Sequence, residues 1–178
     1  MIRILIFLIF ILSIEKTYAC ISITDDLNTS NPVISANFNL LPELGVFKDC
    51  FEGSIRIRTN RSNWRLIANR VGPEPIRING DPKDNIKPKD ITFLATLKAF
   101  GKAPSNGGVL VSPFFYETDL SSIQSGTLIA SGIKKSDNSC SPHNSSFYQI
   151  RSTLCLFRDF VFNVGEYNGE VSYTVIAP

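Results

Sequence analysis

The sequence predicts an all-β protein, built as a single immunoglobulin-like β-sandwich of about seven or eight strands. Apolar and polar residues alternate with a period of two over most of the chain after residue 30, which is typical of half-buried strands. Glycine, proline, asparagine and aspartate separate the alternating segments, and no long window has the spacing of an amphipathic helix. Together these observations favour strands over helices.

The alternation also places the strands along the chain. A short helical turn is expected over 119–124, after Thr118, a residue type that often caps a helix N-terminus. The expected strands cover 34–40, 55–58, 64–68, 91–99, 109–116, 127–133, 147–164 and 165–178.

The last segment is the most informative. Asn168-Gly169 is an ordinary hairpin-turn sequence, but the inward-facing residues stay in phase straight through it. We therefore predict one long strand, with Gly169 opposite a bulky neighbour or at a bulge, and we expect this strand to be central to the fold. The residues predicted in the core are Trp64, Leu66, Tyr167, Val171, Tyr173 and Val175.

The N-terminal residues have the three parts of a secretory signal peptide. Arg3 precedes the apolar run 4–14, and Thr17-Tyr18-Ala19 is an acceptable cleavage site. The run is much shorter than the roughly 20 residues that a membrane-spanning helix needs. We predict a signal peptide over 1–19, a single domain over 20–178 and no integral membrane span. The mature protein would then be at the cell surface, in a periplasm or secreted.

Four cysteines follow the predicted cleavage site: Cys20, Cys50, Cys140 and Cys155. An even number in an exported chain indicates two disulfides, with three possible connectivities. We favour Cys20–Cys50 with Cys140–Cys155, because each pair joins neighbours along the chain. Lipid modification of Cys20 is the alternative, but the preceding residues lack the aliphatic residue of a lipobox, and lipidation would leave an odd thiol.

The remaining composition favours binding over chemistry. The formal net charge is +2, with both signs interspersed, which gives no signature of nucleic-acid binding. His143 is the one histidine, so we predict no metal site, no cofactor and no catalytic residue. Phe114, Phe115 and Tyr116 are candidates for surface binding, because two neighbouring rings on a strand cannot both face inward.

Two segments resemble bacterial surface proteins. Residues 59–66, with Trp64 and Leu66, resemble the Trp-x-Leu segment of WxL-type domains. Residues 164–175 resemble the final strand of WxL-like, spore-coat-U-like and pilin-like secreted proteins, and the early Cys20 is similar to the latter two groups. A second tryptophan motif of WxL domains is missing. The resemblance implies an immunoglobulin-like sandwich that acts in adhesion, surface assembly or envelope structure, with envelope proteins, surface proteins or glycans as partners.

Three functional hypotheses follow. The first is an exported, non-catalytic surface or periplasmic protein. The second is a secreted hydrolase that uses a pair of carboxylates, although no spacing singles out two of them. The third is a periplasmic module that binds a small ligand or a glycan. The absence of catalytic histidine patterns and the strand-rich sequence favour the first.

Cleavage and oxidation of this chain can be tested directly by mass. We expect the mature protein to begin at Cys20 with an unmodified amino group and to contain no free thiol. Intact mass spectrometry before and after alkylation without reductant measures both properties. A diacylglycerol adduct, or any alkylated cysteine in the native protein, would contradict this expectation.

Overall fold

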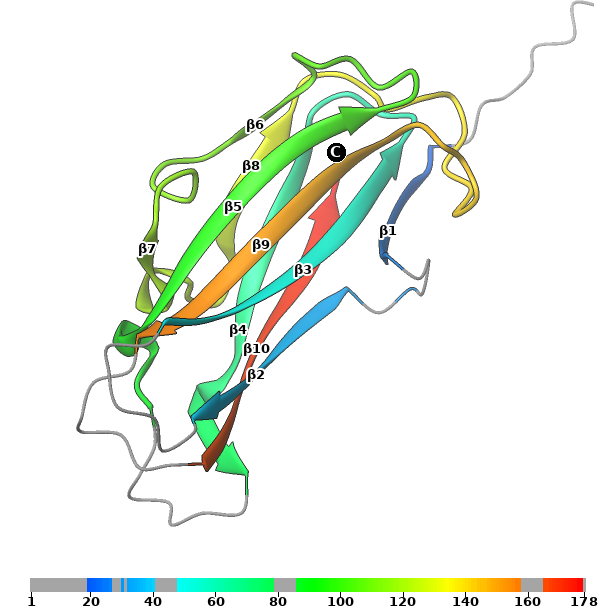
Figure 1. Cartoon of the computed structure of the whole chain (residues 1–178). Helices are drawn as coiled ribbons and strands as arrows, with labels where there is room; N and C mark the ends of the chain where they lie inside the picture. The colour runs from blue at the N-terminus through cyan, green and yellow to red at the C-terminus, as the bar shows by residue number, and fades with distance from the viewer. Residues whose placement is uncertain are drawn as a thin grey trace, which may run out of the picture.

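The protein folds as two antiparallel β-sheets packed face to face, as the computed structural model shows (Figure 1). The model describes residues 19–26, 30, 32–40, 48–78, 86–157 and 165–177, and the predicted signal peptide lies outside this part except for Ala19. The described residues contain no α-helix. The predicted all-β sandwich is therefore confirmed, with ten strands instead of seven or eight.

The odd-numbered strands form one sheet and the even-numbered strands form the other. The odd sheet has the order β1 (Ile21–Asp25), β3 (Lys48–Thr59), β9 (Phe147–Phe157), β5 (Ile91–Phe100) and β7 (Thr118–Asp119). The even sheet has the order β2 (Val33–Leu40), β10 (Gly165–Ile176), β4 (Trp64–Ile78), β8 (Thr127–Gly132) and β6 (Gly108–Leu110).

Each connection between consecutive strands thus passes from one sheet to the other. Among the described strands, none forms hydrogen bonds with its neighbour in the chain, so each of their ladders joins segments that are distant in sequence. The inward-facing apolar residues of both sheets meet in one core. Its large, fully buried side chains include Phe38, Ile55, Ile57, Trp64, Leu66, Ile91, Phe93, Tyr148 and Tyr167.

Trp64 is buried in this core, as predicted. It is fully buried, its ring centroid is 5.1 Å from that of Tyr148, and its indole N–H donates a hydrogen bond of 3.1 Å to the carbonyl oxygen of Lys134. The ring lies against Gly132, where a Cβ atom would come within 2.0 Å of it. A glycine is therefore required opposite the indole.

The predicted single C-terminal strand is also confirmed. β10 pairs with β2 on one side and with β4 on the other, so it occupies an interior position of the even sheet. The register to β4 shifts between Asn168 and Glu170, where residues 72–75 of β4 have no counterpart in the ladder, so Gly169 lies at an irregularity as expected. Tyr167, Val171 and Tyr173 are buried, and Val175 packs partly buried against the core.

Tyr173 also forms a polar contact between the two sheets. Its hydroxyl lies 2.7 Å from Ser152 Oγ of β9, and both side chains are buried. Burial raises the pKa of the Tyr173 phenol well above its ordinary value. The pair therefore stays neutral and satisfied inside the core.

Two local predictions need correction. The short helical turn is present as the 3-10 segment Leu120–Ser122, but the residue before it is Asp119, with no side-chain cap, and not Thr118. The strand predicted over 109–116 is confined to β6, which ends at Leu110. Pro113 has no N–H to donate to a ladder, and turns follow it.

All four cysteines form disulfides, but the favoured pairing is wrong. The bonds join Cys20 to Cys140 and Cys50 to Cys155, with Cα–Cα distances of 6.0 and 4.1 Å. Cys50 and Cys155 lie directly opposite each other on β3 and β9. Along a strand, Cys50 is about 30 Å from the position beside Cys20, far beyond disulfide reach. The disulfide at Cys20 also uses the sulfur atom that a lipid anchor would need.

Truncating the buried indole tests the core. We expect Trp64→Ala to lower the free energy of unfolding by about 3–5 kcal/mol, because the substitution removes the largest core side chain. Trp64→Phe keeps an aromatic ring and loses the hydrogen bond to Lys134, so its loss should be clearly smaller. Urea denaturation of the three proteins measures the difference. An alanine variant as stable as the wild type would contradict the burial of Trp64.

A matched pair of lysine substitutions tests the position of β10. We expect Val171→Lys to abolish soluble folded protein, because it buries an unpaired ammonium group in the core. Thr174→Lys, on the exposed face of the same strand, should fold normally. Circular dichroism and size-exclusion chromatography report the outcome, and a Val171→Lys variant that folds as well as Thr174→Lys would contradict the burial of Val171.

Candidate binding surface

One end of the sandwich collects most of the described basic side chains. We call it the basic end; it comprises the loops 60–63, 101–107 and 133–146 and the strand ends that adjoin them. Figure 1 shows these loops together at the end where β1 begins and β5 ends. Asp25, Asp26 and Asp137 are the acidic residues that the described part contributes here. The basic residues are Arg56, Arg58, Arg61, Arg65, Lys98, Lys102, Lys134 and Lys135.

The opposite end has no such excess. Lys48, Lys87 and Lys89 lie there among the described residues, together with Asp49, Asp90, Glu117 and Asp119. Glu117 accepts a hydrogen bond of 2.7 Å from Lys48 Nζ, and this contact, with a second from Thr92, lowers the pKa of the Glu117 carboxyl. The charges of the described chain are therefore polarised along the strands.

Strand register brings the basic residues of the odd sheet to one surface. Side chains directly opposite each other on neighbouring strands share a face. Phe147 pairs with Phe100 across β9 and β5 in one such outward-facing row. Arg58, one residue beyond the last β3–β9 pair (Ile57 with Tyr148), extends the row onto β3, where it contacts the Phe147 ring. The next row inward from the basic end consists of Arg56, Gln149 and Lys98.

Phe100 and Phe147 of the first row form a stack of flat groups with Arg58 and with Arg56 of the next row. The rings of Phe100 and Phe147 are 4.9 Å apart and inclined by 21°. The guanidinium carbons of Arg56 and Arg58 lie 5.1 and 5.0 Å from the centre of the Phe147 ring. These are ordinary distances for offset aromatic stacking and for cation–π contacts. We call these four side chains the arginine–phenylalanine stack.

Arg58 is the fixed member of the stack. Its side chain is 2% exposed; Nε donates to the carbonyl oxygen of Asn144 and Nη1 donates to Thr24 Oγ1, each at 2.9 Å. Burial, together with the nearby charge of Arg56, lowers the pKa of the Arg58 guanidinium. Because an arginine keeps its proton in proteins, Arg58 remains a fixed positive charge at neutral pH.

The long loop 133–146 is fastened to the sheets at several points. Ser136 and Thr59 exchange hydrogen bonds, and the disulfide of Cys140 ties the loop to Cys20. Asp137 accepts a hydrogen bond from the backbone N–H of Asn138, which lowers the pKa of its carboxyl, with further contributions from Asn144 and Lys102. The exposed Lys134 and Lys135 are therefore carried on an anchored loop.

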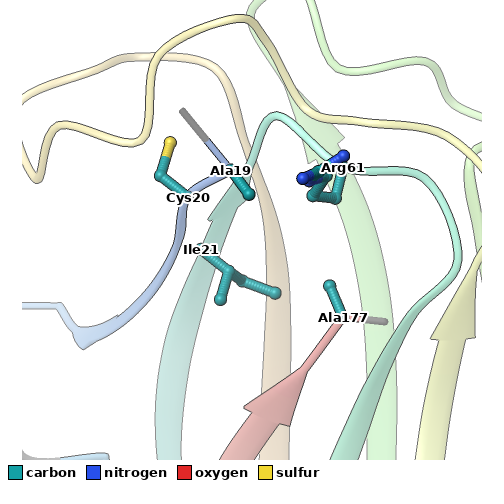
Figure 2. Close-up of a pocket in the computed structure, with 5 residues that line it drawn as sticks. All are labelled: Ala19, Cys20, Ile21, Arg61 and Ala177. Carbon is teal, nitrogen blue, oxygen red and sulfur yellow. The ribbon is translucent and has the colours of Figure 1, made fainter. Parts of the chain in front are cut away.

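A small hollow opens where the chain enters and leaves the sandwich. Ala19, Cys20, Ile21, Arg61 and Ala177 surround a volume of about 190 Å³ between the start of β1, the β3–β4 turn and the end of β10 (Figure 2). Asn60 holds the entering chain here, since its Oδ1 accepts a hydrogen bond of 2.9 Å from the backbone N–H of Cys20. Arg61, one of the basic residues of the basic end, lines this hollow.

The predicted aromatic surface is only partly correct. Phe114 is 3% exposed and packs edge-on against Phe93 in the core, so it cannot bind at the surface. Phe115 and Tyr116 are 42% and 65% exposed, with ring centroids 4.4 Å apart. Their segment adjoins the middle of β5, where Ala95 donates to the carbonyl oxygen of Phe114, and not the basic end. His143 is exposed.

The outer face of the even sheet has a different character. Val71, Val109 and Ile176 are exposed on it, and its charged residues are few among those described: Arg65 and Glu170. Glu170 accepts a hydrogen bond from Ser35 within the sheet. Charge is thus concentrated on the odd sheet and at the basic end.

The described residues contain no group of three or more histidine, cysteine, aspartate or glutamate side chains that could hold a metal ion. None of the described segments is a helix with the length and apolarity to cross a bilayer. No family model matches the sequence, and comparisons with curated proteins and with solved structures find no match.

Proposed function

We propose that this protein is an exported, non-catalytic binding domain that attaches to an anionic partner through its basic end, in adhesion or in assembly of the cell envelope. The observation that carries this proposal is the gathering of eight basic side chains, against three acidic ones, at one end of the described sandwich. Such a field attracts and holds a polyanion without any chemical step.

The scaffold suits this role. Two disulfides are typical of proteins that work in an oxidising compartment outside the cytoplasm. Each disulfide joins segments more than 100 residues apart, and one of them fastens a loop of the basic end directly. A charged surface on anchored elements loses little conformational entropy when it binds.

Removal of the predicted signal peptide would strengthen the same surface. Cleavage before Cys20 turns the backbone nitrogen that now donates to Asn60 Oδ1 into an α-amino group. This group is largely protonated at neutral pH, since its ordinary pKa is about 7.7–8.0. The mature protein then has one more positive charge beside Arg61.

Matched charge reversals test the basic end. We expect the mature protein to bind long-chain inorganic polyphosphate with an affinity that falls steeply as salt rises. The double variant Lys134→Glu/Lys135→Glu should lower the slope of log K against log [salt] by about two, because two cation–anion contacts are lost. Isothermal titration calorimetry at several salt concentrations measures the slope.

The control carries the same change of net charge at the other end. Lys87→Glu/Lys89→Glu should leave the slope nearly unchanged, because Lys87 precedes the 3-10 segment Pro88–Asp90 and Lys89 lies within it, at the end remote from the basic loops. Equal losses in both double variants would show that only total charge matters. Absence of binding by the wild type would refute the proposal itself.

A further inference from the structure

We infer that the anionic partner is an acidic polysaccharide, and that Phe100 is the platform on which one of its sugar rings stacks. This inference rests on the proposed function and names the chemistry of its ligand. The observations behind it are the arginine–phenylalanine stack and the lysines on either side of it.

Phe100 is the open end of the stack. The separation of the Phe100 and Phe147 rings, 4.9 Å, matches the spacing of neighbouring strands, so the two rings stand side by side on β5 and β9. Phe147 is covered by Phe100 on one side and by guanidinium groups on the other. Phe100 has one ring face covered by Phe147 and is still 39% exposed.

The edge of the sheet leaves room for a ligand at this ring. In the described part of the chain, β5 pairs with β7 at Thr92 and Phe93, at the far end of the strand from Phe100. No ladder partner therefore continues the row Arg58–Phe147–Phe100 beyond Phe100. A ligand ring placed there extends the stack by one more layer.

Positive charges flank this platform along the chain. Lys98 faces the same side two residues earlier on β5, and Lys102 follows in the turn after the strand. Both lysines are exposed. A ligand that rests on Phe100 thus meets an ammonium group on each side, which suits an apolar face bordered by carboxylate or sulfate groups.

A pyranose ring with acidic substituents has this pattern. One face of the ring presents C–H groups with a partial positive charge, and the face of an aromatic ring is the negative part of its quadrupole. The carboxylate or sulfate groups lie around the rim, within reach of the lysines. A chain of such sugars can then continue over the remaining cations of the basic end.

Single-stranded nucleic acid fits this surface less well. Proteins that bind it stack successive bases on successive aromatic side chains. At the basic end the stack offers one open ring face, because both faces of Phe147 are in use. The polysaccharide is therefore the ligand that the geometry favours.

The rigidity of the stack also favours a ring ligand. Arg58 is held by Thr24 and Asn144, Arg58 and Arg56 hold Phe147, and Phe147 supports Phe100. A ligand that stacks on Phe100 thus meets a side chain whose orientation is already fixed. Less conformational entropy is lost on binding than with a mobile ring.

Three ligands of matched charge separate the contributions of ring and charge. The probes are an oligogalacturonate of about ten residues, inorganic polyphosphate of equal charge, and a thymidine decamer. We expect Phe100→Ala to weaken oligogalacturonate binding about tenfold, since one stacked ring is lost. Its affinity for polyphosphate should change less than twofold. Phe100→Tyr should keep wild-type affinity for the saccharide.

Phe115→Ala is the matched control, because it removes another exposed phenylalanine away from the basic end. It should bind all three probes as the wild type does. Loss of saccharide binding in this control, and not in Phe100→Ala, would overturn the inference in favour of the surface of Phe115 and Tyr116. Circular dichroism and thermal unfolding confirm that each variant is folded before binding is compared.

Two further results would overturn the inference while leaving the proposed function intact. One is equal weakening of saccharide and polyphosphate by Phe100→Ala, which would show that the ring acts only by supporting the basic end. The other is tighter binding of the thymidine decamer than of the saccharide, with a loss in Phe100→Ala, which would identify a nucleic-acid site. Absence of polyphosphate binding by the wild-type protein would instead refute the proposed function.

Discussion

The whole structure depends on the strict alternation of the chain between two sheets. Each strand leaves its sheet at one end and continues in the other sheet, so a strand finds its hydrogen-bonded neighbours only among distant segments. Apolar residues on alternate positions of every strand then face one shared core, and the residues between them face solvent on two outer surfaces. The core, the disulfides and the basic end all follow from this arrangement.

The parts of the fold that depend on local pattern are predictable from sequence, and the parts that depend on pairing are not. Period-two alternation identifies the buried faces, including Trp64 and the residues of β10, because it reflects which side of a strand each residue occupies. Strand pairing is not encoded locally. Cys140 and Cys155 are close in sequence, yet β9 carries the chain about 25 Å from one end of the sandwich towards the other between them, so each cysteine meets a distant partner instead.

The same limit applies to the candidate site. The basic residues come from segments around 56–65, 98–102 and 134–135, which have little in common in sequence. The near-neutral net charge indicates interspersed signs, whereas the fold separates them by bringing three loops to one end. Outward-facing Arg56 and Arg58 on one alternating strand are a local signal of this surface. The stacking of Phe147 between them and Phe100 depends on strand register, which no single segment reveals.

The position of β10 has a consequence for how the chain reaches its destination. A ribosome makes β2 and β4 early, but neither can complete its ladder until β10 emerges, because β10 lies between them. Until then β2 has no strand that joins it to β4, so the even sheet covers the inner face of the odd sheet only in part. Local contacts cannot lock the early segments into a stable unit, since folds rich in distant pairings form slowly. This order of strands suits the export proposed above, because the sandwich cannot be completed before its last strand is made.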